Sequence, residues 1–284
     1  MDGHGRAVAP AAGTVCNALA TGRGSAFAID LETTATVDLD ATGAYSGEVA
    51  DAPAADTTLV ERCAELAVAE WGDGEGATVH TESEVPMAAG LKSSSAAANA
   101  TVLATADALG VDPDPLDACR LGVRAARDAG VTVTGAFDDA SASMLGGVTV
   151  TDNTADDLLA HETVDWDVLV WTPPARAFSA DADVEQCERV APMAELVADL
   201  ALGGRYGKAM TVNGLAFSAA LGFPTDPAVE AMPHADGVSL SGTGPSVVAV
   251  GDRDGLERVR DHWTQREGDT WLTTTRTDGA QVIE

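Results

Sequence analysis

Short apolar runs alternate with polar residues and glycine-rich turns over the first eighty residues, a pattern typical of β-strands. Strands are predicted at residues 6–12, 15–20, 25–30, 33–39 and 77–82. Before the last of these, residues 57–71 carry apolar side chains at helical spacing, with Leu59, Cys63, Leu66 and Ala67 on one face. This part of the chain is therefore predicted to combine strands with a packed helix.

Helical spacing is more frequent in the rest of the chain. Helices are predicted at residues 96–109, 114–129, 191–202, 206–221 and 254–266, and strands at 147–151, 166–172, 247–251 and 271–276. The run 131–140 is strand-like and ends in a polar turn. Because helices and strands mix without strict alternation, the predicted class is α+β, with two closely joined lobes at residues 1–155 and 156–284.

The charge balance is strongly acidic, with 45 Asp and Glu against 16 Lys and Arg and a formal net charge of −29. Hydrophobic residues make up 45% of the chain, so it is expected to fold despite this charge. Scattered carboxylates with few lysines are typical of a solvated surface adapted to high salt, where screening weakens self-repulsion. Such a surface is a poor partner for nucleic acid or an anionic membrane.

The four cysteines are widely spaced and form no C-x-x-C pair, which argues against a disulfide framework or a zinc site. No apolar run reaches the length of a transmembrane helix, and the first residues lack the pattern of a signal peptide. The sequence is therefore expected to be that of a soluble, cytoplasmic protein.

Residues 86–95 form a loop of small residues that runs into a helix-forming stretch. A tight turn before a helix presents free backbone N–H groups and the positive end of the helix dipole, which together bind phosphate. The loop contains Lys92, one of only two lysines in the chain, the other being Lys208. Neither lysine lies in the G-x-x-x-x-G-K-[ST] pattern of a Walker A loop. The alternative is an ordinary strand-to-helix connection with serine caps.

Two further segments contain similar chemistry. Residues 239–246 combine serine, threonine and glycine before an apolar strand, and glycine there lets the backbone approach a ligand closely. Residues 134–141 contain Asp138 and Asp139 between apolar segments, and a carboxylate can accept the proton of an alcohol during phosphoryl transfer. The alternatives are a hairpin turn for the first segment and an Asx turn or helix cap for the second.

Arg23 lies in a glycine and serine turn, residues 20–26, where its guanidinium could hold a carboxylate or phosphate. A structural ion pair is an equal contender, since the chain contains fourteen arginines. The five histidines are dispersed and none is assigned a catalytic role.

Taken together, these motifs resemble those of the GHMP kinases, the superfamily of galactose, homoserine, mevalonate and phosphomevalonate kinases. Residues 86–96 resemble the ATP-binding motif, residues 241–246 the C-terminal glycine-rich motif, and residues 9–14 occupy the place of the N-terminal motif. Within the superfamily, residues 90–96, 134–140 and 20–26 are similar to segments of the archaeal-type shikimate kinases. The acidic composition is similar to that of a haloarchaeal member.

The resemblance implies ATP- and Mg²⁺-dependent phosphorylation of the 3-hydroxyl of shikimate, a step toward chorismate and the aromatic amino acids. It also implies a GHMP fold: an N-terminal lobe with a left-handed βαβ unit, a ferredoxin-like C-terminal lobe, and an active site in the cleft between them. The nucleotide would be bound by Pro86, Ala88, Ala89, Gly90, Leu91, Lys92, Ser93, Ser94, Ser95 and Ala96. The substrate side of the cleft would be formed by Arg23, Gly24, Ser25, Ser241, Gly242, Thr243 and Gly244.

The resemblance also suggests roles for the charged residues. Asp138 would be the base, with Asp139 as its neighbour and possible substitute, and Lys92 would supply a cation. Ser94 and Asp128 are the candidate magnesium ligands, although Arg127 occupies the position where mevalonate kinases have the acidic ligand. Thr14 stands where several members carry a lysine.

Three questions are left open by the sequence. The arginine that binds the substrate carboxylate is one of Arg23, Arg120, Arg124 and Arg176. The acceptor could instead be that of another GHMP kinase, such as homoserine, pantoate or a mevalonate derivative. The chain could also be a nucleotide-binding regulator without activity, or, with least support, an acidic structural protein.

Overall fold

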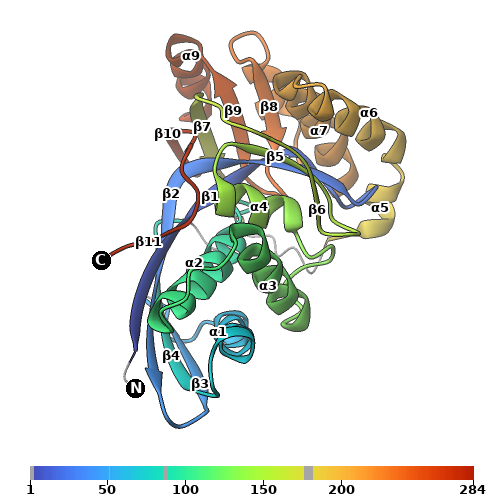
Figure 1. Cartoon of the computed structure of the whole chain (residues 1–284). Helices are drawn as coiled ribbons and strands as arrows, with labels where there is room; N and C mark the ends of the chain where they lie inside the picture. The colour runs from blue at the N-terminus through green and yellow to red at the C-terminus, as the bar shows by residue number, and fades with distance from the viewer. Residues whose placement is uncertain (1–2, 51, 86–88, 176–181) are drawn as a thin grey trace.

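The computed structural model describes residues 3–50, 52–85, 89–175 and 182–284 of the chain. The chain forms two lobes, each with one sheet and its own helices (Figure 1). The order of the first sheet is β11-β1-β2-β4-β3, and β5 and β6 extend it beside β2. The second sheet has the order β10-β7-β9-β8.

Two long strands form the centre of the first sheet. β1 (His4–Cys16) and β2 (Arg23–Asp40) pair antiparallel from His4↔Asp38 to Cys16↔Ser25. The prediction of four short strands here is wrong, because register shifts within the pair absorb the interruptions that resembled turns. Gly13 stays inside β1, since a Cβ there would lie 2.5 Å from Cζ of Phe27.

Smaller strands complete the first sheet. β3 (Tyr45–Val49) and β4 (Gly76–Ser83) are parallel neighbours joined by α1 (Thr58–Trp71), which makes a βαβ unit. β5 (Val148–Asp152) pairs with the start of β2, and β6 (Asp157–Glu162) pairs with β5. The short β11 (Gln281–Val282) returns from the C-terminal lobe to pair with β1. The lobe division at residue 155 stays a prediction, although β6 and β11 both lie in the first sheet.

Alanine-rich helices pack with α1 on the first sheet. α2 (Ser93–Ala108) contacts β1 and β2, and most of its residues are buried. α3 (Pro115–Asp128) packs beside it, with Asp114 accepting hydrogen bonds at its N-terminus. α4 (Phe137–Leu145) packs on β2, β1 and β5. Residues 137–140 were predicted to end a strand, but they begin this helix, because the apolar side chains Phe137, Ala140 and Met144 recur at helical spacing on a buried face.

The C-terminal lobe has a ferredoxin-like arrangement. Its strands are β7 (Asp167–Thr172), β8 (Gly237–Leu240), β9 (Val247–Gly251) and β10 (Asp269–Thr274), so the order is fourth, first, third, second. The helices α6 (Ala191–Leu202) and α7 (Tyr206–Leu221) have the predicted bounds, and α9 (Arg253–Trp263) lies between the last two strands. α5 (Val184–Glu188) and α8 (Asp226–Ala231) are short additions.

A shared apolar core joins the two lobes. Ala11, Val15 and Phe27 of the first sheet pack in one cluster with residues of β7, β9, α6 and α7. Trp166 lies between Phe27 and Tyr206, with ring centroids 5.7 Å and 5.9 Å away. The relative position of the lobes is therefore fixed by buried side chains, which matters for any site formed between them.

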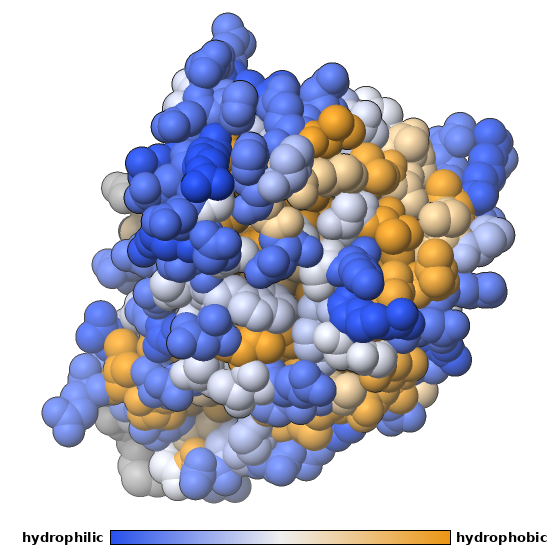
Figure 2. Space-filling view, turned by 90° about the horizontal axis from the view of Figure 1, so that it is seen from above, coloured by the Kyte–Doolittle hydropathy of each residue, from blue (hydrophilic) through white to orange (hydrophobic). Residues whose placement is uncertain are grey.

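The surface, the helix lengths and the cysteines can be compared with what the composition predicts. Hydrophilic residues cover much of the face in Figure 2, while hydrophobic ones gather on the side where Figure 1 places α6, which exposes Met193, Leu196 and Leu202. Among the described residues, no helix is long and apolar enough to cross a membrane. All four cysteines are buried and free.

Candidate active site

A cleft with about 410 Å³ of open space lies where four segments from both lobes meet. These are the end of β1 and its turn, the start of α2, the segment from residue 132 into α4, and the loop between β8 and β9. Its lining consists of Thr14, Asn17, Ala18, Leu19, Lys92, Thr132, Val133, Thr134, Ala136, Asp138, Asp139, Gly242 and Thr243. Three of the motifs selected from sequence thus meet at one cleft.

The predicted phosphate loop leads directly into α2. Lys92 is the N-cap residue and has a left-handed backbone, with φ 65°. Ser93 is half-buried, Ser94 is exposed in the first turn, and Ser95 is buried. Among the described residues no side chain caps the helix, so its first backbone N–H groups are available to an anion. Pro86 and Ala88 of the predicted nucleotide site lie outside the described residues, and Ala89, Leu91 and Ala96 are buried.

The loop that leads into α2 and the loop between β8 and β9 pack directly against each other. Ser241 Oγ donates to the carbonyl oxygen of Gly90 over 2.8 Å, and the Ser246 N–H donates to that of Ala89 over 3.2 Å. A Cβ at Gly90 would overlap the carbonyl oxygen of Ser241 and lie 2.8 Å from that of Gly244. Glycine at position 90 is therefore required by the contact between the lobes as well as by its φ of 82°.

The end of β1 holds the second loop from the opposite side. The Gly242 N–H donates to Thr14 Oγ1, and Asn17 Nδ2 donates to the Gly242 carbonyl oxygen, both over 2.8 Å. Asn17 is itself fixed, because its own N–H donates to Asn213 Oδ1 of α7. Thr14 thus serves as a hydrogen-bond acceptor that positions the loop.

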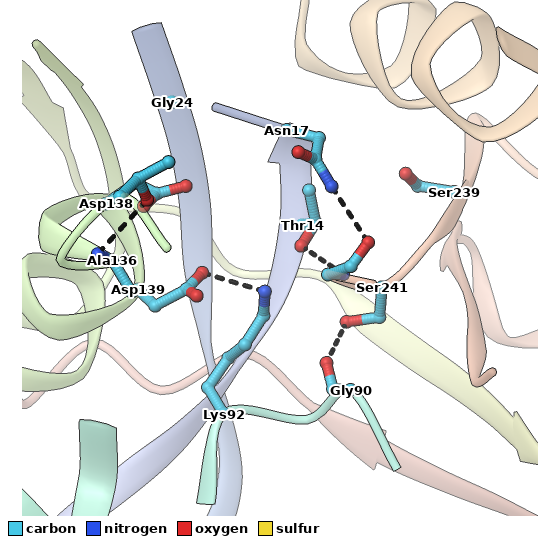
Figure 3. A network of polar contacts seen from close by, with 12 residues as sticks. Thr14, Asn17, Gly24, Gly90, Lys92, Ala136, Asp138, Asp139, Ser239 and Ser241 are labelled. Atoms are coloured by element: carbon cyan, nitrogen blue, oxygen red, sulfur yellow. Dashed lines mark hydrogen bonds and ion pairs between the residues drawn. The ribbon is translucent and has the colours of Figure 1, made fainter. Parts of the chain in front are cut away.

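Lys92 reaches across the cleft to Asp139 of α4 (Figure 3). Its Nζ lies 2.9 Å from Asp139 Oδ1, and the two side chains are only 8% and 13% exposed. Gly242 provides the space for this ammonium, since a Cβ there would lie 2.7 Å from Nζ. Lys92 is the only Lys or Arg among the described residues that line the cleft. The pair therefore places one cation at the N-terminus of α2, an end that already favours anions.

Asp138 is a buried carboxylic acid at the start of α4. Its Oδ1 accepts a hydrogen bond from Asn153 Nδ2 over 2.7 Å. Burial, and after it the nearby Asp139 carboxylate, raises the pKa of Asp138 from 3.8 to about 7, against the opposing effects of Lys92 and Asn153. A carboxyl group with a pKa near neutrality is suited to accept and return a proton at physiological pH.

Gly24 of β2 leaves the space that the Asp138 carboxylate occupies. A Cβ at position 24 would lie 2.5 Å from Asp138 Cγ. We expect Gly24→Ala to push the carboxylate from its place and to reduce kcat by about 100-fold, because a displacement near 1 Å has that cost. Steady-state kinetics would measure this, with Ala28→Gly on the same strand as a control for strand stability. A Gly24→Ala enzyme with wild-type kcat would show that the Asp138 position is irrelevant.

Several predicted site residues lie away from the cleft lining. Asp128, a predicted metal ligand, accepts from Arg62 Nε over 2.8 Å on the surface of α3, so an arginine already pairs with this exposed carboxylate. Ser25 is buried, and Gly244 packs against the Phe223 ring. No group of three or more His, Cys, Asp or Glu side chains in the described ranges could hold a metal ion.

The candidate arginines differ clearly in their surroundings. Arg23 is exposed at the start of β2, next to Gly24, and makes no side-chain ion pair with a described residue. Arg120 donates to the Asp156 carbonyl oxygen and stacks over Phe137, and Arg124 is exposed on α3. Arg176 lies outside the described residues. Arg23 thus directly precedes Gly24, the residue of β2 that packs against Asp138.

Sequence reasoning missed two asparagines of the site. Asn17 follows β1 and Asn153 follows β5, and both are buried, with 5% and 2% exposure. The available signal was a lone amide directly after an apolar strand, where a strand end commonly carries functional side chains. That signal is weak without knowledge of which strands are neighbours.

Comparisons with known proteins agree with the motifs. The model of the GHMP kinases N terminal domain matches residues 58–147. A shikimate kinase from Halobacterium salinarum is 66% identical over 281 residues, which cover 98% of this chain and 99% of the relative. A shikimate kinase from Methanococcoides burtonii is 50% identical over 261 residues, or 91% of each chain.

Solved structures share the fold at low sequence identity. A homoserine kinase from Cytophaga hutchinsonii superposes with a TM-score of 0.78 at 17% identity, covering 100% of this chain and 98% of that one. The Methanococcus jannaschii mevalonate kinase gives a TM-score of 0.77 at 14% identity, covering 96% and 98%. At these identities the likeness establishes the two-lobed architecture alone.

Proposed function

The chain belongs to the shikimate kinases of the GHMP kinase family, and on that basis we propose that it transfers a phosphoryl group from MgATP to the 3-hydroxyl of shikimate in the cleft between its lobes. One observation carries the proposal: Lys92 at the N-terminus of α2 and the acids of α4 line the same cleft. A phosphate-binding helix end thus lies across from a carboxylate that can take an alcohol proton.

The ATP phosphates would bind at the first turn of α2. The free N–H groups there and the Lys92 ammonium supply positive charge where negative charge accumulates during transfer. When the phosphates arrive, Lys92 can leave Asp139 for a phosphate oxygen, because its four-carbon stem is flexible. Binding energy therefore comes from backbone dipoles and one cation rather than from a Walker A loop.

Mg²⁺ suits this site if the nucleotide supplies most of its ligands. Magnesium typically keeps several waters and binds through substrate phosphates and one or two protein groups. The exposed Ser94 hydroxyl in the first turn of α2 is the protein group that would hold it, and Asp139 lies across the cleft. Bound there, the ion would neutralise charge on the transferring phosphoryl group.

Asp138 would orient the acceptor hydroxyl and take its proton. A pKa near 7 leaves enough carboxylate at neutral pH to act as a base. Shikimate also carries a carboxylate, and Arg23 is the described arginine we assign to it, since its guanidinium has no competing ion pair among the described residues. Ser241, Gly242 and Thr243 would form the substrate wall on the C-terminal lobe.

The test is an ADP-release assay in molar KCl with shikimate, homoserine, pantoate and mevalonate offered separately. We expect ADP only with shikimate, and only with Mg²⁺ present. Release with another alcohol alone would assign a different GHMP kinase activity, and binding of ATP without release in any arm would favour the regulatory alternative. The molar salt is chosen because the charge of −29 and the haloarchaeal relative support a cytoplasmic, salt-adapted enzyme.

A further inference from the structure

Asn153, in the turn between β5 and β6, makes two hydrogen bonds with Asp138. Its Nδ2 donates to Asp138 Oδ1 over 2.7 Å, and its Oδ1 accepts from the Asp138 backbone N–H over 3.1 Å. We propose that Asn153 is a positioning residue that aims Asp138 at the acceptor alcohol and leaves Oδ2 as the atom that takes the proton. This inference rests on the proposed function, in which Asp138 is the base.

The orientation of the Asn153 amide follows from its partners. A backbone N–H can only donate, so the amide atom facing the Asp138 N–H must be the oxygen. The Thr151 hydroxyl lies 2.7 Å from that same oxygen and donates to it. The NH₂ group is therefore the one that faces the carboxyl group of Asp138. It donates a hydrogen bond to Oδ1 whether or not the acid is protonated. Oδ2, on the side of Gly24, is left to exchange the proton.

The backbone of Asn153 is anchored independently of any ligand. Its N–H donates to the Gly22 carbonyl oxygen over 2.8 Å, and its carbonyl accepts from Arg127 Nη2 over 3.2 Å. Arg127 is held in turn by Asp156, with both carboxylate oxygens 2.7 Å from its guanidinium. The same guanidinium donates to the Thr134 carbonyl oxygen over 3.3 Å, so it connects the turn to the segment leading into α4. Arg127, where related kinases carry an acid, thus supports the grip on Asp138.

The charges around Asp138 determine how its pKa would change if the hydrogen bond from Asn153 were lost. Facing it are Asp139 on its own helix, Lys92 from the start of α2, and Cys16 from β1. The hydrogen bond from Asn153 favours the charged carboxylate and so lowers the pKa of Asp138, while burial and Asp139 raise it. Removing the amide must therefore move this pKa further above 7.

The experiment compares pH profiles of kcat/KM for shikimate in the full-length enzyme. The acid limb is the rise of activity with pH as Asp138 loses its proton. In Asn153→Ala we expect it to move up by about one pH unit, so that activity at pH 7 falls about fivefold and recovers by pH 9. Asn153→Asp keeps the shape and both acceptor contacts but puts a carboxylate beside Asp138, and its limb should move further. Thr151→Val removes one of the two donors to the amide oxygen and a long contact to the Gly24 carbonyl oxygen, and it should give a smaller shift with the fold intact.

Asn99→Ala is the matched control. Asn99 is also a fully buried asparagine that donates to α4, at the Ala140 carbonyl oxygen, but among the described residues its amide makes no hydrogen bond with Asp138. It should lower thermal stability without moving the acid limb. If Asn153→Ala and Thr151→Val keep the wild-type limb while the wild-type limb itself is abolished by Asp138→Asn, the positioning role is wrong and the proposed base stands. If Asp138→Asn keeps full activity, the proposed base itself is wrong.

Discussion

Asp138→Asn is expected to reduce kcat by about 10²–10⁴-fold, the usual contribution of a general base, while nucleotide affinity stays near that of the wild type. The amide is isosteric with the carboxylate, so it can keep its place between Gly24 and Asn153, but it cannot accept the proton of the alcohol. The measurement pairs ADP release under saturating substrates with equilibrium binding of a non-hydrolysable ATP analogue. Retained kcat, with binding intact, would contradict the assignment.

Asp139→Asn is the matched comparison for this prediction. Asp139 lies on the same turn of α4 and is paired with Lys92, so its loss frees the cation and removes one of the causes that raise the Asp138 pKa. We therefore expect a downward shift of the acid limb with a smaller loss of kcat. If Asp139→Asn is inactive and Asp138→Asn is active, the two acids exchange roles.

Stability provides an independent check on Asp138→Asn. The pKa of Asp138 is raised to about 7 when folded, and the ordinary value applies when unfolded, so the folded state holds this proton more tightly. The wild type therefore loses stability as pH rises from about 4 through 7, and this loss is absent from the variant. The free energy of unfolding of Asp138→Asn relative to wild type should rise over that range and level off above it.

The sequence was most informative where local pattern and tertiary structure agree. α6, α7 and β9 have the predicted bounds, because each is an apolar-periodic run with clear ends. In the first forty residues the predicted strand boundaries are wrong, because alanine and glycine in β1 and β2 interrupt the hydrophobic pattern without interrupting the strands. There the pairing partner and the Phe27 ring over Gly13 decide the structure, and neither is visible locally.

For the site too, the sequence identifies some of the residues but not the contacts between them. Lys92 and Asp138 could be selected because a rare lysine and adjacent acids stand out in sequence. Their geometry could not, because Lys92 meets Asp139 only after α2 and α4 pack, and Gly24 meets Asp138 from 114 positions earlier in the chain. Asp128 shows the converse: the resemblance to mevalonate kinases suggested it as a metal ligand, whereas the packing of α1 on α3 pairs its carboxylate with Arg62.

Lys92→Met should lower kcat/KM for ATP by about 10²–10³-fold, the cost of removing one preorganised charge from a transition state. It should also move the acid limb upward, since Lys92 lowers the pKa of Asp138. Lys208→Met is the natural control, because Lys208 is the only other lysine and is exposed on α7. Its kinetics should match the wild type.

A second variant separates catalysis from stability at Lys92. Lys92→Met leaves the Asp139 carboxylate, only 13% exposed, without its cation, so thermal stability should fall. The double variant Lys92→Met with Asp139→Asn removes both charges and should recover stability but not ATP turnover. Recovery of both would mean that Lys92 serves only to neutralise Asp139. Recovery of stability alone would place the lysine on the phosphates, because then its charge is needed by something other than the acid it contacts.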